Sequence, residues 1–211
     1  MVQQRWLSSL PSVLRYGDPR LRVISQTCAL PADAATLQTE RQLHQALHAF
    51  RVTHGYGRAI SAPQLGAPIR MIACNLGLAA VHRRGDQPFT LCNPRVTWRS
   101  TETFSLWDDC MSIPETMVRL RRHESISLVY QDPDGRQNAW ERLGRAEAEL
   151  MQHELDHLDG RLAVDYAAGC IVACCISLVA SMDRCVSALL HAAASTLTFM
   201  AAYVPLLRLR P

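Results

Sequence analysis

Two histidines four residues apart, His153 and His157, constrain this chain more than any other feature. They are the ends of the sequence His-Glu-Leu-Asp-His, within residues 145–158, whose apolar positions have helical periodicity. On a helix, positions i and i+4 lie on one face, so both imidazoles can reach one metal ion. Glu154 would lie beside that ion, where a carboxylate can take a proton from water. The motif therefore predicts a metal-dependent hydrolase.

A catalytic metal needs a third protein ligand and an open coordination position. A metzincin would place a third histidine six residues after His157, but position 163 is Ala, and no Glu follows Glu154 to serve a thermolysin-type site. These absences disfavour an endoprotease. Asp165, Asp183 and the upstream His and Cys residues stay open as candidates for the third ligand.

Composition excludes several other kinds of chemistry. All 22 basic residues are Arg, so the chain has no lysine for Schiff-base catalysis, a phosphate loop or a kinase site. The formal net charge of +3 is small and the arginines are scattered, so we predict no direct binding of nucleic acid. The eight cysteines include no Cys-x-x-Cys pair, and the chain is too long and apolar for a disulfide framework. We expect a reducing compartment.

The order of predicted elements indicates an α+β fold, because strands precede a helix without βαβ alternation. Residues 1–35 are rich in turns. Helices are predicted over residues 36–52 and 145–158, and strands within residues 69–74, 89–98, 124–130 and 138–141.

The composition changes abruptly after about residue 166, which predicts a catalytic domain over 1–166 and an apolar extension over 167–211. Residues 185–207 are 23 consecutive positions without a charged side chain, long enough to cross a bilayer. A membrane anchor is one interpretation of this extension. The alternatives are a helix packed on the domain and a poorly ordered tail.

Three motifs, in the same order, resemble those of peptide deformylases. Residues 57–66, Gly-Arg-Ala-Ile-Ser-Ala-Pro-Gln-Leu-Gly, resemble the first, Gly-x-Gly-hydrophobic-(Ala/Ser)-Ala-Pro-Gln-x-Gly. Residues 108–112, Asp-Asp-Cys-Met-Ser, resemble the second, Glu-Gly-Cys-Leu-Ser, and residues 152–158 match the third, Gln-His-Glu-x-Asp-His-Leu. The resemblance covers roughly residues 12–166.

The resemblance implies mostly antiparallel strands around a central metal-binding helix, and an amidase that removes formyl from N-terminal formyl-methionine. It assigns one divalent metal to Cys110, His153 and His157, with Fe²⁺ as the first expectation and Zn²⁺, Ni²⁺ or Co²⁺ as alternatives. Glu154 would act as general base and then general acid. By the same resemblance, the Gln64 side chain and the Met111 backbone N–H form the oxyanion hole, and the predicted substrate contacts are Gly57, Arg58, Ile60 and Asp109.

The second motif departs from the family pattern. Asp108 replaces Glu, and by ungapped spacing its basic partner would be Arg122. Asp109 replaces Gly, which puts a carboxylate next to the metal ligand, where the family brings backbone close to substrate. That charge could favour substrates with a free or basic group, or narrow the cleft. Arg58 is a candidate to offset it.

Because Asp109 is unusual, we retain two alternatives: a deformylase-like amidase acting on another N-acyl substrate, and a non-catalytic relative that binds nascent chains. The expected partners are N-formyl-methionyl peptides of nascent chains, near the ribosome. The family's distribution implies the cytoplasm for a bacterial source and a mitochondrion or plastid for a eukaryotic one.

Overall fold

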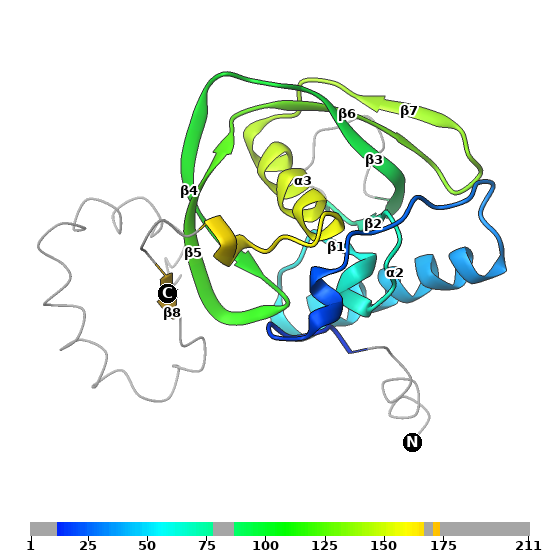
Figure 1. The fold of residues 1–211 in the computed structure, drawn as a ribbon, viewed down its shortest axis with the longest axis horizontal. Helices are drawn as coiled ribbons and strands as arrows, with labels where there is room; N and C mark the ends of the chain where they lie inside the picture. The colour runs from blue at the N-terminus through cyan, green and yellow to red at the C-terminus, as the bar shows by residue number, and fades with distance from the viewer. Residues whose placement is uncertain (1–11, 78–86, 167–170, 174–211) are drawn as a thin grey trace, which may run out of the picture. The chain divides into compact units, whose positions relative to one another are not determined.

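A computed structural model of the chain describes residues 12–77, 87–166 and 171–173. This part contains two antiparallel sheets and two long helices, arranged as in Figure 1. The helices are α2 (Ala34–His54) and α3 (Arg145–Leu158), with short 3-10 turns η1 (Pro19–Arg22), η2 (Ala62–Leu65) and η3 (Ala163–Tyr166). One sheet has the order β1 (Ala59–Ser61), β2 (Met71–Cys74), β3 (Phe89–Arg99), β6 (Ile126–Gln131) and β7 (Gln137–Trp140). The other has the order β4 (Thr103–Cys110), β5 (Ile113–His123) and β8 (Ile171–Ala173).

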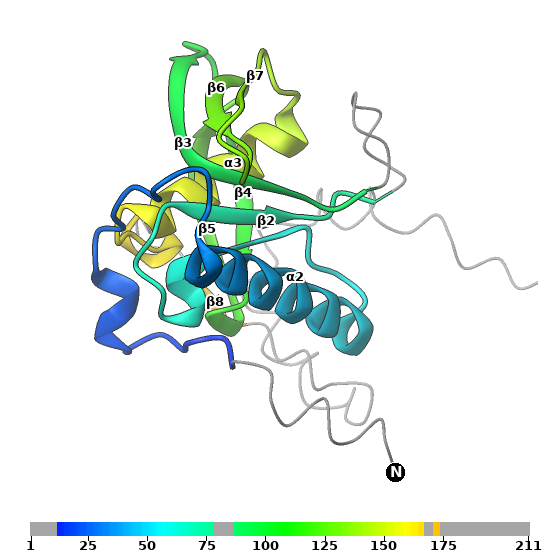
Figure 2. The same ribbon diagram turned by 90° about the vertical axis from the view of Figure 1, so that its right-hand side faces the viewer.

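The strand β2 shows how the five-stranded sheet is buried on both faces. Ile72 and Cys74 pack into a cluster with α3, whereas Met71 and Ala73 pack into a cluster with α2. Successive side chains of a strand point to opposite faces, so an uninterrupted apolar run is expected here. Figure 2 shows α2 and α3 on opposite sides of β2.

The central helix α3 is unusual because its buried surface includes ionisable groups. Apolar residues such as Met151 and Leu158 are buried, but so are His153, Glu154 and His157. Burying such groups costs free energy unless they are paired, hydrogen-bonded or bound to a metal. The second half of α3 is therefore where function is expected.

The three-stranded sheet brings Cys110 to α3. β4 and β5 pair from Thr103↔His123 onward, and the register shifts between Asp109 and Cys110, next to the turn that joins the two strands. This irregularity lies beside the predicted metal ligand, in keeping with the frequent placement of bulges next to active sites.

The segment before α2 contacts both η2 and the end of α3 through backbone hydrogen bonds. The Leu14 N–H donates to the Gln64 carbonyl (2.8 Å), and the Ser25 N–H donates to the Leu158 carbonyl (2.9 Å). Near the end of α3, Gly160 has φ +70°, and a Cβ there would lie 2.6 Å from the Arg22 carbonyl oxygen. Glycine is required at this crossing for both reasons.

The α+β prediction is confirmed, as are both helices and the strands predicted near β2, β3, β6 and β7. β1, β4, β5 and β8 were not predicted. β8 adds residues 171–173 to the edge of β5, beyond the predicted boundary at residue 166. The stretch 185–207 lies outside the described residues, and within those residues no helix is both long and apolar enough to span a membrane.

Candidate metal centre

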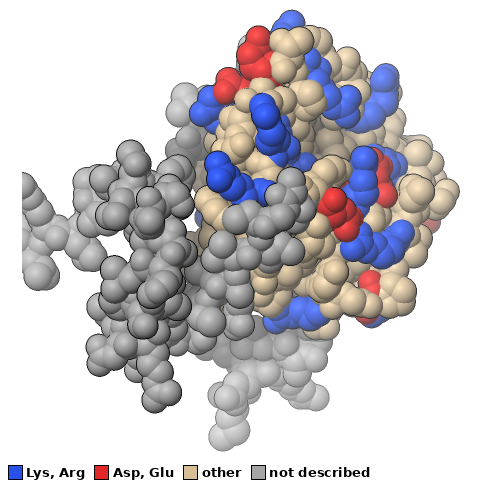
Figure 3. All heavy atoms as spheres, turned by 60° about the vertical axis from the view of Figure 1, so that its left-hand side comes forward, with Lys and Arg blue, Asp and Glu red and all other residues tan. Residues whose placement is uncertain are grey.

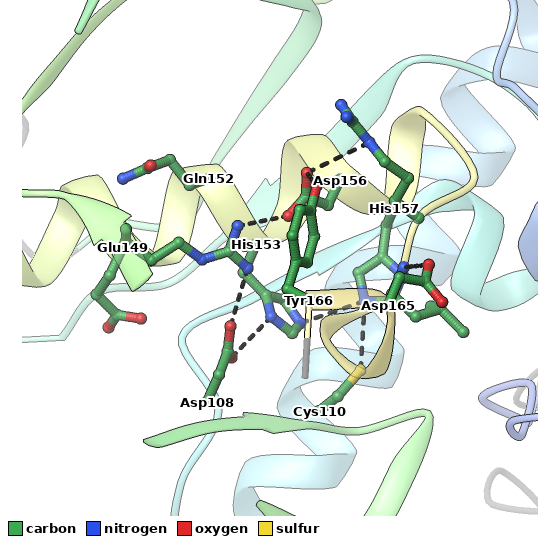
Figure 4. Close-up of polar contacts among 12 residues, drawn as sticks. Asp108, Cys110, Glu149, Gln152, His153, Asp156, His157, Asp165 and Tyr166 are labelled. Atoms are coloured by element: carbon green, nitrogen blue, oxygen red, sulfur yellow. Dashed lines mark hydrogen bonds and ion pairs between the residues drawn. The ribbon is translucent and has the colours of Figure 1, made fainter. Parts of the chain in front are cut away.

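Cys110, His153 and His157 meet at one buried point. The Cys110 Sγ lies 3.3 Å from Nε2 of His157, which lies 3.2 Å from Nε2 of His153. One ligand atom from each of the three side chains lies within 4.8 Å of the others. Figure 4 shows the three side chains pointing toward one another, the cysteine from β4 and the histidines from α3. Cys110 is a free thiol. Sulfur and imidazole donors at such spacing suit Fe²⁺, Zn²⁺, Ni²⁺ or Co²⁺.

A buried carboxylate orients the first histidine. Asp108 Oδ1 lies 2.8 Å from Nδ1 of His153, and Asp108 Oδ2 accepts from Nη2 of Arg122 at 2.9 Å. The predicted partnership of Asp108 with Arg122 is thus confirmed. A carboxylate on the outer nitrogen fixes the ring and its tautomer, so that Nε2 is left for the metal.

The Arg122 guanidinium continues this network to a second acid. Its Nη1 also donates to Asp156 Oδ2, and the Tyr166 hydroxyl donates to Asp156 Oδ1 at 2.8 Å. Sequence reasoning assigned Asp156 and Tyr166 no role. The position of Asp156 in the third motif could have indicated a role for it. Tyr166 lies outside the three motifs, so no sequence pattern indicated its contact.

The two imidazoles have opposite electrostatic surroundings. Burial lowers the pKa of His153, but the Asp108 carboxylate and the neighbouring Cys110 side chain outweigh it, so its pKa is well above the ordinary value. Burial, with the neighbouring His153, places the pKa of His157 well below the ordinary value. A metal ion requires both rings to be neutral and therefore competes with a proton at His153.

Glu154 is a buried carboxyl without a structural partner for one of its oxygens. Its Oε2 has no hydrogen-bond partner in the part of the chain that the structure describes. Burial raises the pKa of Glu154 to about 7. A group poised near neutral pH can both accept and return a proton, which is the property of a general acid–base catalyst.

The Gln64 side chain is held with its NH₂ group toward Cys110. Its Oε1 accepts from the Ser61 backbone N–H (2.9 Å) and from the Ser61 hydroxyl (3.0 Å). Its Nε2 lies 3.9 Å from Cys110 Sγ and 3.3 Å from the Ser112 hydroxyl. Because the oxygen is fixed, the nitrogen is a preorganised donor beside the candidate metal centre.

A cleft of about 360 Å³ opens beside these groups. Its wall includes Gln64, Met111, His153 and Glu154, together with Gly57, Arg58, Asp109, Tyr56 and Leu150. Gly57 has φ +116°, a conformation that favours glycine. The volume suits a small ligand or the end of a peptide.

One predicted substrate contact, Ile60, lies differently from expectation, whereas Arg58 lines the cleft. Ile60 is fully buried against α2 and is absent from the cleft wall; its side chain points to the α2 face because alternate residues of β1 face opposite sides of the sheet. Arg58 pairs with Glu149 and donates to the Ala146 carbonyl at 2.9 Å. Asp109 is exposed and has no ion pair among residues 12–77 and 87–166. The expected offset of its charge by Arg58 is therefore not what the structure shows.

Comparison with known proteins agrees with this geometry. The model of the polypeptide deformylase family matches residues 10–170. The peptide deformylase of Bartonella henselae is 33% identical over 151 residues, which cover 71% of this chain and 79% of that protein. That of Bartonella tribocorum is 30% identical over 155 residues, covering 74% and 83%.

Solved structures agree as well. Peptide deformylase from Thermotoga maritima has a TM-score of 0.63 and 26% identity, covering 75% of this chain and 98% of that one. The enzyme from Synechococcus elongatus, solved in complex with actinonin, has a TM-score of 0.64 and 27% identity, covering 75% and 80%.

Proposed function

Since the chain belongs to the peptide deformylase family, we propose that Cys110, His153 and His157 bind the metal ion of its active site. The chain is a metal-dependent hydrolase that removes the formyl group from the N-terminal formyl-methionine of polypeptides. The convergence of a thiol and two imidazoles next to Glu154 is the observation that carries the assignment. We propose Fe²⁺ as the ion, and the cytoplasm as the compartment, in keeping with the bacterial relatives.

When bound, a divalent cation supplies a Lewis acid that polarises the formyl carbonyl and makes water more acidic. The chain itself supplies the proton transfers. The Glu154 carboxylate takes a proton from the attacking water and then returns one to the departing amine nitrogen. The formyl C–N bond is replaced by a C–O bond, so the products are formate and a peptide with a free α-amine.

The charge that develops on the formyl oxygen needs donors already in place. We propose that the Gln64 Nε2 and the Met111 backbone N–H supply them. The two hydrogen bonds from Ser61 to Gln64 Oε1 support this role, because they prevent the amide from turning its oxygen toward the substrate. Preorganised donors of this kind lower the barrier without further reorganisation.

The cleft beside the metal centre would hold the peptide, and Gly57 lets its wall pack on α2, since a Cβ there would lie 3.1 Å from Phe50 Cδ1. The Asp109 carboxylate has no partner among the described residues and lines this cleft. We propose that it attracts a basic group on the residue that follows formyl-methionine. Arg58 serves mainly to hold α3 through Glu149 and Ala146.

Formate release from N-formyl-Met-Ala tests the proposed function. The full-length chain, loaded with Fe²⁺ without oxygen, is expected to release formate, and Glu154→Gln is expected to lose activity by about 10²–10⁴-fold. Glu147→Gln, on the first turn of the same helix, is a control that should keep activity. A variant Glu154→Gln with unchanged turnover, or a metal-loaded chain that releases no formate, would contradict the proposal.

A further inference from the structure

A second cleft, of about 400 Å³, is separate from the cleft beside the metal centre, although Arg122 in its wall also contacts Asp108. It shares no lining residue with the first cleft. Its walls come from β3, the end of β5, the outer side of α3 and the segment that follows α3. Six arginines line it: Arg70, Arg95, Arg99, Arg121, Arg122 and Arg161. In Figure 3, where the side carrying β4 and β5 comes forward, basic side chains are spread over the surface and acidic ones are few.

The acidic residues of this cleft neutralise only part of its charge. Asp156 and Asp159 are its two acids, and Asp108 pairs with Arg122 behind the wall, so six guanidinium groups meet three carboxylates. Asp159 is shared by Arg70 (2.8 Å) and Arg161 (2.9 Å). A formal excess of three positive charges in a concave site attracts anions more strongly than the same charges would on a flat surface.

Three of these arginines have no carboxylate partner in the described parts of the chain. Arg95 and Arg99 are exposed on β3, and neither side chain makes a hydrogen bond or ion pair to another described residue. Among the described residues, the Arg121 side chain donates only to the Thr103 hydroxyl, at 2.6 Å. The ends of β3 and β5 meet nearby, because His123 Nδ1 lies 2.7 Å from the Ser100 carbonyl oxygen. The available guanidinium groups thus come from two neighbouring strands.

A buried donor in the wall is also unsatisfied. Arg122 is only 6% exposed, and its Nε–H has no acceptor among the described residues although both its Nη atoms are paired. Buried polar groups are nearly always hydrogen-bonded, but this Nε atom is itself closed to solvent. The three arginines without a carboxylate partner are therefore the groups that point to an anionic ligand.

We propose that this cleft binds a small polyphosphate anion, either free or carried on a nucleotide. Guanidinium groups match phosphate oxygens in planar, paired hydrogen bonds, and the chain uses arginine alone for its cations. The volume is that of a small-molecule site. A long nucleic acid fits less well, because its backbone needs a basic surface that extends beyond one cleft of small-molecule size.

Calorimetric titration of the full-length, metal-loaded protein with inorganic tripolyphosphate tests this site. We expect saturable binding, weakened at least tenfold in Arg95→Gln/Arg99→Gln. The matched control is Arg15→Gln/Arg41→Gln, which removes two exposed arginines outside the cleft and should bind as the wild type does. Arg121→Gln provides an independent variant on the other strand and should also weaken binding. Both double variants should release formate at the wild-type rate.

Equal affinity in the wild type and Arg95→Gln/Arg99→Gln would overturn the proposal, as would equal weakening in the control pair. Titration with ATP in place of tripolyphosphate distinguishes a nucleotide ligand from a free polyphosphate. Tighter binding of ATP supports a nucleotide, and equal or weaker binding supports a free polyphosphate.

A 12-nucleotide single-stranded RNA tests the remaining alternative. If it binds more tightly than both small ligands, and loses affinity in Arg95→Gln/Arg99→Gln, the ligand of this cleft is a nucleic-acid backbone and the proposal of a small anion is overturned. If Arg95→Gln/Arg99→Gln loses polyphosphate binding but still releases formate, the anion site is shown to be independent of the proposed catalytic function.

Discussion

The Asp108 carboxylate lies 2.8 Å from the outer nitrogen of His153, in a region where both residues are buried. This contact fixes the ring that brings Nε2 to the candidate metal centre. Asp108 is therefore a positioning residue, and its pKa of about 2 follows from His153 and Arg122, which together outweigh the effect of burial.

The variant Asp108→Asn removes the charge while keeping the size of the side chain. We expect its affinity for Zn²⁺ or Co²⁺ to fall about 10–100-fold, which is the usual effect of losing a partner of a ligating histidine. Competition with a coloured chelator measures this directly. Asp134→Asn, which changes an exposed acid paired only with Arg136, should bind metal normally. Unchanged affinity in Asp108→Asn would show that the contact does not orient His153.

The raised pKa of Glu154 predicts a stability difference that depends on pH. In the unfolded chain this carboxyl has its ordinary pKa of 4.5, whereas in the metal-free folded protein its pKa is about 7. As pH rises from 4.5 to 7, the unfolded wild type releases a proton that the folded form still holds, so the wild type loses stability.

Glu154→Gln cannot lose this proton, so it should gain stability relative to the wild type by about 3 kcal/mol across that pH range. Urea unfolding of both metal-free proteins at pH 4.5, 6 and 7.5 measures the difference. A difference that stays constant with pH would mean that Glu154 ionises normally in the folded protein.

Gln64→Ala should slow turnover while leaving the metal in place. Loss of one preorganised oxyanion donor costs about 10²–10³ in kcat, and Gln64 provides no metal ligand. Metal content by atomic absorption and kcat for N-formyl-Met-Ala separate the two effects. Gln38→Ala, on the exposed side of α2, is the control. An unchanged kcat would remove Gln64 from the proposed oxyanion hole.

Asp109→Asn should reduce a charge preference between substrates. For the wild type at low salt we expect kcat/KM for N-formyl-Met-Arg to exceed that for N-formyl-Met-Glu by about fivefold, the size of an exposed ion pair. The ratio should approach one in Asp109→Asn, and it should also fall in high salt. A wild-type ratio of one at low salt would show that this carboxylate does not contact the following residue.

Gly160→Ala should destabilise the fold where the segment before α2 crosses the end of α3. The new Cβ would lie 2.6 Å from the Arg22 carbonyl oxygen, and a positive φ adds strain. Gly17→Ala has the same kind of strain, at φ +99°, but no atom within 4 Å. We expect Gly160→Ala to cost about 2 kcal/mol more than Gly17→Ala. Thermal unfolding compares the two, and equal midpoints would mean that the backbone yields at this crossing.

The helices could be predicted because their signals are local. The periodicity of residues 145–158 predicted α3, and the spacing of its two histidines predicted that both bind one metal ion. The hairpin of β4 and β5 could not be predicted, because Arg122 is buried where an apolar residue belongs in an alternating strand. Its burial makes sense only with Asp108 and Asp156 beside it. The pair with Asp108 was predicted from the second motif, but Asp156 lies on α3, 34 residues along the chain. The pairing of Arg58 with Glu149 is likewise a tertiary contact that no local pattern reports.

The burial of β2 on both faces has a consequence for catalysis. In a strand with one polar face, a slip of one residue would expose apolar side chains, and that penalty fixes the alignment. β2 has no polar face, so its alignment depends on the hydrogen bonds at its ends, from the Asn93 N–H to the Arg70 carbonyl and from the Asn75 N–H to the Arg58 carbonyl, each 2.8 Å. A slip of β1 against β2 would carry Gln64 about 3.3 Å along the strand direction. The distance between the amide donor and the metal centre is therefore set by the alignment of two strands that contribute no metal ligand.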